Sequence, residues 1–361
     1  MTTSTSGTQL AVLSQSGCTV SFFDLATGER THLIDVLPEG HELCFDPDRR
    51  MLYASHTYSN GYYLVHEAKG HQISVIDVDT HEIADVIDIG PEHAPHAMHL
   101  DTATGTLFVS VEEGPAGPGG ILALDPKTGQ ITARFSAEAP VPHSAALTPD
   151  GRKAYTANKQ TPYVSVIDTA SGETRRIAVP GSEGIAVSPD GTRVFVATPT
   201  IFAEGAHTIE VIDTATDEIV HSIPLTAAAG PVHVTSDGKL LVGQWGTTDP
   251  TVWGSFDSTG EPRSRGGSLA IFDANSYQPL GEVPIDLGPI NVTATADAAT
   301  AFVANLQSGT VTVADLHTYE VITTLVVDRG EHLSPDRTIP NQGAHGLALI
   351  PPAPVAKPAR G

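Results

Sequence analysis

The feature that most constrains the fold of this chain is an internal repeat. Seven times, at intervals of 42 to 60 residues, an apolar stretch ends in an aspartate and a polar turn follows; these are Asp24, Asp77, Asp125, Asp168, Asp213, Asp273 and Asp315. Between them run two further apolar stretches joined by a turn, as in residues 145–158 and 185–198. Alternating apolar residues bounded by Gly, Asp and Pro predict short antiparallel strands joined by tight hairpins. Four strands in each of seven units predict an all-β, seven-bladed β-propeller.

The two ends of the repeat region indicate how the ring closes. Residues 343–350 match the innermost strand of a blade but have no partner strands after them, whereas residues 9–36 have three outer strands and no innermost one. The C-terminal strand is therefore expected to complete the N-terminal blade, which removes both sheet edges. We expect residues 9–350 to form a single propeller domain, residues 1–8 a flexible N-terminus and residues 351–361 a Pro/Ala-rich tail.

The same stretches resemble the YVTN β-propeller repeat family. The matching pieces are the Pro-Asp-Gly turns at 149–151 and 189–191, Tyr-Thr-Ala-Asn at 155–158, Phe-Val-Ala-Asn at 302–305 and Val-Ser-Val-Ile-Asp at 164–168. The resemblance covers about residues 9 to 350 and implies the propeller fold. It implies no activity, since the shared motifs are turns and core strands.

Composition narrows the partners of the chain. Its formal net charge of −23 argues against nucleic acid or an anionic membrane surface as a partner. The N-terminal residues 1–9 have no basic stretch followed by an apolar run, and no segment is apolar for long enough to span a membrane. Two cysteines, Cys18 and Cys44, do not make a disulfide framework. These observations predict a cytoplasmic protein, monomeric by default, whose partner is a small molecule.

The loops predicted on one face of the ring are long and irregular. On the opposite face the turns are short, such as residues 188–191 and 148–151. The long segments are residues 56–71, 198–207, 243–267 and 328–345. Long loops on a rigid scaffold are where binding residues are usually placed, and the innermost strands begin on this face.

Counting back from the turn of each blade finds one recurrent residue at the start of the innermost strand. His41, His143 and Glu183 each lie seven residues before the turn aspartate of their blade, and His96 and His345 occupy the equivalent position by matching Leu100 and Leu349 to Leu147. The other two blades have Gly230 and Ile290 there. Because a closed ring brings equivalent positions together, four histidines and one glutamate are predicted to meet at the axis. A slip of one residue in a pleated strand would turn these side chains away from the axis.

Four neutral imidazoles favour a transition metal over Mg or Ca, and we predict Fe, Cu or Zn held by His41, His96, His143 and His345. Glu183 is the candidate catalytic residue, as a general base, a fifth ligand or a partner that orients an imidazole. The sequence thus predicts a metalloenzyme acting on a small molecule at the axial pocket. Redox or oxygen chemistry is slightly favoured over metal-assisted lyase, cyclase or lactonase chemistry.

The sequence leaves three alternatives open. The histidines could form a structural, hydrogen-bonded ring, the site could use His and Glu as acid and base without metal, or the propeller could bind a ligand or protein without catalysis. Other histidines, and aromatic residues of the long loop at 243–267, are candidates for contacting a substrate. They are His56, His71, His233 and Trp245, the last with Trp253 and Phe256 as an apolar lid.

Overall fold

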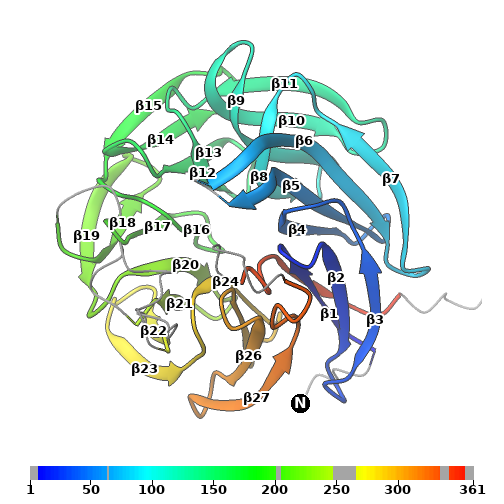
Figure 1. Cartoon of the computed structure of the whole chain (residues 1–361). Helices are drawn as coiled ribbons and strands as arrows, with labels where there is room; N and C mark the ends of the chain where they lie inside the picture. The colour runs from blue at the N-terminus through cyan, green and yellow to red at the C-terminus, as the bar shows by residue number, and fades with distance from the viewer. Residues whose placement is uncertain (1–6, 63–64, 201–204, 247–265, 334–340, 354–361) are drawn as a thin grey trace, which may run out of the picture.

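The structure, a computed structural model, describes residues 7–62, 65–200, 205–246, 266–333 and 341–353. Strands β1 to β28 form seven four-stranded antiparallel sheets, which are arranged as blades around a central axis (Figure 1). The predicted all-β, seven-bladed propeller is therefore confirmed. Among these residues there is no helix with the length and apolar composition that crossing a membrane requires.

Each blade runs from an innermost strand at the axis to an outermost strand at the rim. In that order, the first blade is β28 (Leu347–Ile350), β1 (Gln9–Ser14), β2 (Thr19–Asp24) and β3 (Arg30–Asp35). The second is β4 (Gly40–Asp46), β5 (Met51–Tyr62), β6 (Val65–Asp77) and β7 (Glu82–Asp88), and the third β8 (His93–Asp101), β9 (Thr106–Gly114), β10 (Gly117–Asp125) and β11 (Gln130–Ser136). The fourth is β12 (Pro142–Leu147), β13 (Lys153–Asn158), β14 (Tyr163–Asp168) and β15 (Thr174–Ala178). The fifth is β16 (Ile185–Val187), β17 (Arg193–Thr198), β18 (Thr208–Asp213) and β19 (Glu218–Pro224). The sixth is β20 (Ala229–Val234), β21 (Lys239–Gln244), β22 (Ser268–Asp273) and β23 (Pro279–Pro284), and the seventh β24 (Pro289–Ala294), β25 (Thr300–Asn305), β26 (Thr310–Asp315) and β27 (Glu320–Val326).

The ring closes as the sequence predicts. Strand β28, from the C-terminal part of the chain, pairs antiparallel with β1, so that Leu349 lies opposite Leu10 and Ile350 opposite Gln9. The first blade therefore contains segments more than 300 residues apart in the sequence, and β1 is not left as an unpaired edge.

The repeated aspartates end the third strand of every blade, because their carboxylates cap the turn that follows. Asp168 is typical: its Oδ1 accepts hydrogen bonds from the backbone N–H groups of Ala170 (3.0 Å) and Ser171 (2.7 Å). This short polar side chain offers the backbone a partner that the sheet no longer supplies. The most regular feature of the sequence is thus a turn signal.

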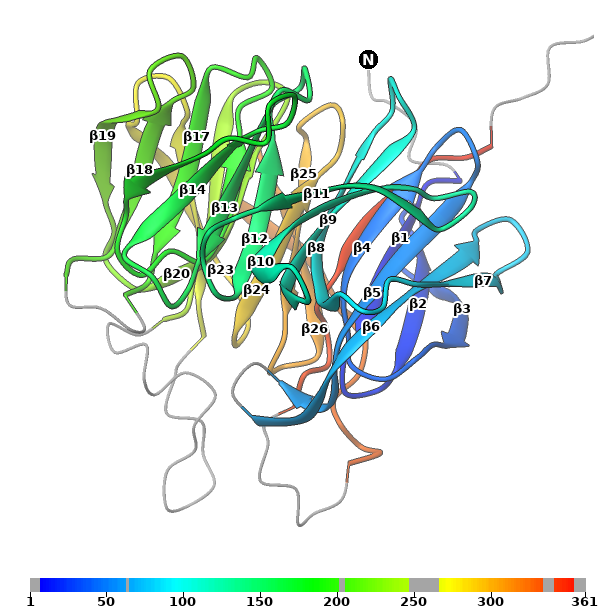
Figure 2. The ribbon, with the colours of Figure 1, turned by 90° about the horizontal axis from the view of Figure 1, so that it is seen from above.

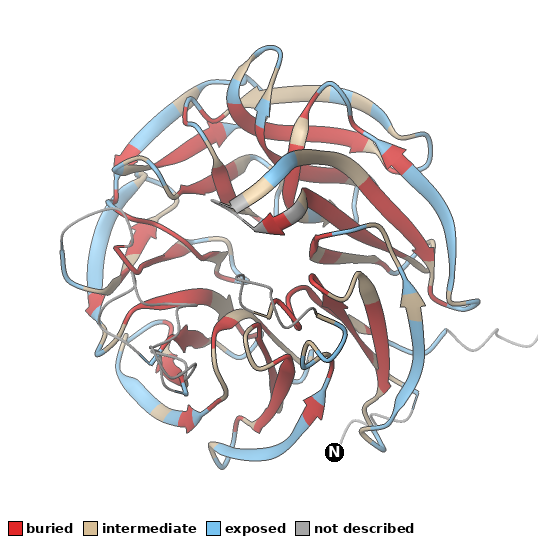
Figure 3. Ribbon diagram, viewed as in Figure 1, coloured by how far each residue is buried: buried red, intermediate tan, exposed pale blue. Residues whose placement is uncertain are grey.

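The hydrophobic core is divided among the seven interfaces between blades. One cluster, for example, joins Leu13 and Phe22 of the first blade to Leu52 and Ile76 of the second. Six further clusters fill the other interfaces in the same way. The outermost strands are mostly exposed (Figure 3), as in β3 and β27. This arrangement leaves the axis itself to the innermost strands.

One hairpin is much longer than the others. β5 and β6 contain 12 and 13 residues and run past the ring on one face (Figure 2). The long loop predicted at residues 56–71 is therefore wrong: residues 56–62 and 65–71 extend the two paired strands instead, because the backbone groups of the segment pair with each other across the hairpin. Residues 201–204, 247–265 and 334–340 of the other predicted long loops, with Trp253 and Phe256, lie outside the described residues.

Candidate functional site

The four register histidines meet at the axis of the propeller. The imidazole centroid of His96 lies 3.8 Å from that of His143 and 5.0 Å from that of His41. The centroid of His345 lies 4.7 Å from that of His41 and 6.4 Å from that of His96. We call these four side chains the histidine cluster. They come from three inner strands, β4, β8 and β12, and from the residues just before β28.

A β-bulge at the start of the inner strands sets the direction of these side chains. In β12 the pairing register shifts between Pro142 and Ser144, around His143, and equivalent shifts occur in β4, β8, β20 and β24. A bulge adds one residue to a strand and re-aims a side chain. The backbone at the bulges is held from the neighbouring blade: the Ser55 hydroxyl donates to the His96 carbonyl (2.9 Å) and the Ser110 hydroxyl to that of His143 (3.1 Å).

The cluster is buried and uncharged. The four residues are 1 to 6% exposed. Burial lowers the pKa of His41 to about 3, and it holds the pKa values of His96, His143 and His345 well below the ordinary 6.5. The positive charge of Lys159 lowers all four pKa values further. Neutral imidazoles keep the nitrogen lone pair that a metal ion or a hydrogen-bond donor requires.

Among the four histidines of the cluster, His96 is the one whose two ring nitrogens both lack a hydrogen-bond partner among the described residues. Both nitrogens are also buried. By contrast, Nδ1 of His41 lies 3.1 Å from the carbonyl oxygen of Glu39, which fixes this nitrogen as a donor and leaves Nε2 with its lone pair. Buried polar groups without partners are costly, so the nitrogens of His96 indicate a place for a ligand.

Glu183 lies beside the cluster, as predicted, and is paired with a lysine that the register does not identify. Its Oε1 is 2.9 Å from Nζ of Lys159 and 3.7 Å from Nδ1 of His143. Its Oε2 is buried and has no hydrogen-bond partner among the described residues. The lysine thus compensates the carboxylate charge, while one oxygen stays available to a donor.

A second carboxyl group, Glu42, lies next to His41 in the sequence and reaches the axis from β4. Its Oε2 accepts a hydrogen bond from Nδ2 of Asn291 (2.7 Å), and its Oε1 is 3.7 Å from Nδ1 of His345. Burial raises the pKa of Glu42 to about 8. The inner strands therefore place polar side chains at two successive positions around the axis.

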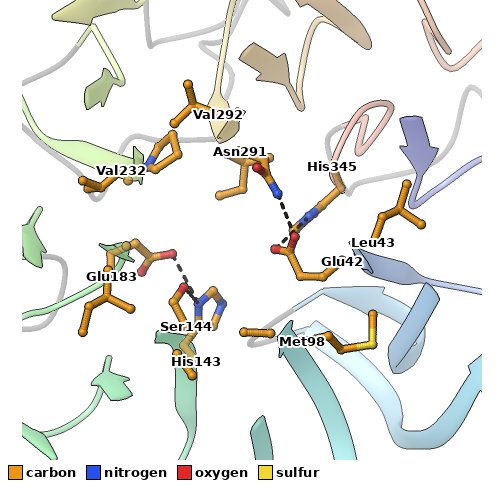
Figure 4. A pocket seen from close by; sticks show the side chains of 17 residues that line it. Glu42, Leu43, Met98, His143, Ser144, Glu183, Val232, Asn291, Val292 and His345 are labelled. Atoms are coloured by element: carbon orange, nitrogen blue, oxygen red, sulfur yellow. Dashed lines mark hydrogen bonds and ion pairs between the residues drawn. The ribbon is translucent and has the colours of Figure 1, made fainter. Parts of the chain in front are cut away.

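These polar groups surround a cavity of about 180 Å³ (Figure 4). Its polar walls are His143, Glu183 and His345 at the register position, with Glu42, Ser144 and Asn291 at the next one. Its apolar walls include Met98, Ile185, Val232, Ile290 and Val292. The volume holds several water molecules, or an organic molecule of comparable size.

The long hairpin covers the other part of the cluster. Tyr58 of β5 is 2% exposed, and its ring meets that of His41 edge to face at 5.2 Å. The Tyr58 hydroxyl donates to Oε1 of Glu112 (2.5 Å), and the tip of the hairpin is held by Glu39, whose Oε1 accepts from the N–H of Gly61 (3.0 Å). His41 is thereby shielded, whereas His143 and His345 line the cavity.

The four predicted substrate-contacting residues are not brought to this cavity. His56 is buried between Ser74 (2.8 Å) and the carbonyl of Pro38 (3.2 Å), and His71 is half-buried and pairs with Asp88 (2.8 Å). His233 is half-buried on β20 and is absent from the described residues that line the cavity.

Trp245 is 1% exposed, and its indole N–H donates to the carbonyl of Pro289 (2.9 Å). It explains the glycine at the register position of the sixth blade, because a Cβ on Gly230 would lie 2.8 Å from the indole ring.

The predicted metal ligands are close together, but their nitrogens do not converge on one point. Among the described residues, no group of three or more His, Cys, Asp or Glu side chains is arranged so that it could hold an ion. The imidazoles would have to turn about their side-chain bonds to point at one ion.

Burial of neutral histidines predicts that acid destabilises the fold. Burial lowers the pKa of His41 to about 3 and that of His56 to about 4, so the unfolded chain binds more protons below pH 6.5 than the folded chain does. Above pH 6.5 the two histidines do not lower the free energy of unfolding, because they are neutral in both states. As the pH falls from 6.5 towards 4, they lower it progressively. At pH 5, each of these two histidines should lower the free energy of unfolding by about 2 kcal/mol. Urea unfolding at pH 7.5 and 5.0 measures this. His56→Gln should reduce the pH dependence, and the same change at the exposed control site His221 should not. A flat wild-type profile would contradict the assignment.

Comparisons with known proteins support the fold. No protein-family model and no curated protein matches the chain. A chain from the hydrazine synthase of Kuenenia stuttgartiensis is similar over 86% of this chain and 93% of that one, with 20% identity and a TM-score of 0.68. A functionally unknown protein from Desulfotomaculum acetoxidans DSM 771 is similar over 95% of this chain and 99% of that one, with 12% identity and a TM-score of 0.66.

Identities this low show a shared fold. Because 1545 chains of solved structures match, the fold is too widespread to indicate an activity. The class is thus a seven-bladed β-propeller with a buried polar axis, and membership of the YVTN repeat family remains a prediction.

Proposed function

We propose that this protein is a metal-dependent enzyme that acts on a small molecule in the axial cavity. The observation that carries the proposal is His96, whose two ring nitrogens are buried without partners among the described residues, inside a cluster of three other neutral imidazoles. A structural ring of histidines would be expected to satisfy these nitrogens with hydrogen bonds. A transition metal bound by the cluster would instead take up the lone pair of one of the two nitrogens.

Two of the four ring spacings in the histidine cluster fit this proposal. The metal–nitrogen bond of an imidazole ligand is about 2.0–2.1 Å long, so two rings on one ion should have centroids about 4.5–5.5 Å apart. The centroid of His41 lies within this range of those of His96 (5.0 Å) and His345 (4.7 Å). The His96–His345 spacing of 6.4 Å and the His96–His143 spacing of 3.8 Å lie outside it, so His96, His143 and His345 would have to turn to bind one ion. His41, His96 and His345 would hold the ion, with His143 as a fourth ligand. An all-nitrogen set suits Fe, Cu or Zn.

The bound metal would supply a Lewis acid or a redox centre beside the cavity. The chain's own residues prepare the cavity for a substrate. Lys159 lies 2.9 Å from Oε1 of Glu183, and the unpaired Oε2 of Glu183 can accept a proton or a hydrogen bond from a substrate. The hairpin residue Tyr58 excludes water from His41. Redox or oxygen chemistry is slightly favoured, and metal-assisted lyase, cyclase or lactonase chemistry is the nearest alternative.

The competing function is a propeller that binds a ligand or protein without catalysis. Its support is the lack of converged ligand atoms among the described side chains. The two functions differ in whether the cluster takes up a metal.

Elemental analysis of protein purified without an affinity tag tests the proposal. We expect near-stoichiometric Fe, Cu or Zn, either as purified or after incubation with the ion and removal of the excess. Protein that contains no metal and takes up none would contradict the proposal and favour the non-catalytic alternative.

A further inference from the structure

The axial cavity has two polar walls that face each other (Figure 4). Glu183, just before β16, forms one of them. Glu42 of β4 and Asn291 of β24 form the other, where the two side chains are joined by a hydrogen bond of 2.7 Å. Apolar side chains such as Ile185, Val232 and Val292 line the space beside them.

Each polar wall has hydrogen-bonding capacity to spare. At Glu183, Lys159 occupies Oε1, and Oε2 is buried without a partner among the described residues, so this wall calls for a donor. At the other wall, the bond to Glu42 uses one N–H of the Asn291 carboxamide. A carboxamide also carries a second N–H and a carbonyl oxygen, so this wall can serve a group that both donates and accepts.

Charge selects against ionic ligands. The Lys159 ammonium lies 2.9 Å from Glu183 and would repel a second cation at that wall. An anion would face the Glu183 carboxyl group in a protein of net charge −23. A hydroxyl group is neutral, donates one hydrogen bond and accepts others, and therefore satisfies both walls.

From this arrangement we infer that the axial cavity binds a small neutral molecule with a hydroxyl group at each end, that is, a short diol or polyol, between Glu183 and the Glu42–Asn291 pair. The inference rests on the proposed function in one respect: the same cavity would be the reaction site, and the hydroxyl compound would be the substrate. Binding itself does not require the metal.

Three compounds of similar size and different charge test this inference. Glycerol is neutral, glycerate is an anion, and 2-amino-1,3-propanediol is a cation at neutral pH. Ligand-observed NMR titrations with chelator-treated, metal-free full-length protein measure their affinities. We expect glycerol to bind, and the two ions to bind at least about tenfold more weakly.

Variants locate the binding. Glu183→Gln and Asn291→Ala, which change opposite walls in different blades, should each weaken glycerol binding about tenfold. Glu218→Gln on the exposed outer strand β19 should leave it unchanged. Thermal unfolding confirms that each variant is folded, and either wall variant suffices for the test. Tighter binding of glycerate or of the amine, no binding of glycerol, or unchanged binding in a folded wall variant would overturn the inference.

The outcome is separable from that of the proposed function. If the protein takes up metal but does not bind glycerol, the metal site is supported and this inference is wrong. If the protein binds glycerol at these walls but takes up no metal, this inference is supported and the proposed metalloenzyme function is wrong.

Discussion

A chain shortened to end at residue 343 is expected to lose its cooperatively folded ring. The missing segment contains β28, which pairs with β1, and its removal exposes the edge of that strand at the axis. It also removes Leu347 from the core between the seventh and first blades and Ile350 from the core between the first and second. Deleting one buried side chain of this size costs about 2–5 kcal/mol, so losing several approaches the whole stability of a domain, about 5–15 kcal/mol.

A matched pair of substitutions distinguishes the effect of disrupting the ring closure from the effect of introducing an aspartate elsewhere. Ile350→Asp places a carboxylate at a site that is 1% exposed, whereas Ile322→Asp makes the same change on β27 at a site that is 56% exposed. Urea unfolding followed by intrinsic fluorescence should show a loss of several kcal/mol for the first. The second should change stability by about 0.5 kcal/mol or less. A shortened chain that unfolds at the wild-type urea concentration would show that β28 does not close the ring.

The fold could be predicted from the sequence because each blade repeats the same turn chemistry. An aspartate that caps the turn after the third strand marks every unit, and the unmatched strands at the two ends show how the ring closes. The register histidines could be identified for the same reason, since equivalent residues of a closed ring share one axis. The bulges that aim these side chains inward leave no clear mark in a single sequence, because they depend on contacts such as that of Ser55 with His96 in the next blade.

The rest of the site could not be found by counting the register alone. Glu42 and Asn291 occupy the position after it, and the same count applied one residue later would find both. Lys159 lies in the turn between β13 and β14 and has no counterpart in the repeat. Tyr58 belongs to a hairpin extension of one blade, so its contact with His41 depends on how that hairpin folds back. Trp245 was predicted to contact substrate, but its ring fills the space left by Gly230.

Replacing His96 is expected to have the largest effect on metal binding. Its ring contacts three other histidines of the cluster, and neither nitrogen has a hydrogen-bond partner among the described residues. Loss of a residue that merely orients a ligand lowers metal affinity about 10- to 100-fold, so loss of a central ligand should lower it at least about 100-fold. His96→Ala should affect the stability of the fold less than it affects metal binding, because the change breaks no hydrogen bond of the imidazole with the described residues.

The decisive measurement is therefore the Zn²⁺ affinity of wild type, His96→Ala and His99→Ala, by competition with a chromophoric chelator. His99 lies on the same strand, β8, but is exposed and outside the histidine cluster, so it controls for adventitious binding by a histidine. We predict one tightly bound ion in wild type and in His99→Ala, and at least about a 100-fold loss in His96→Ala. Wild type that binds no Zn²⁺, or a His96→Ala variant that binds it equally well, would contradict a metal site at the propeller axis.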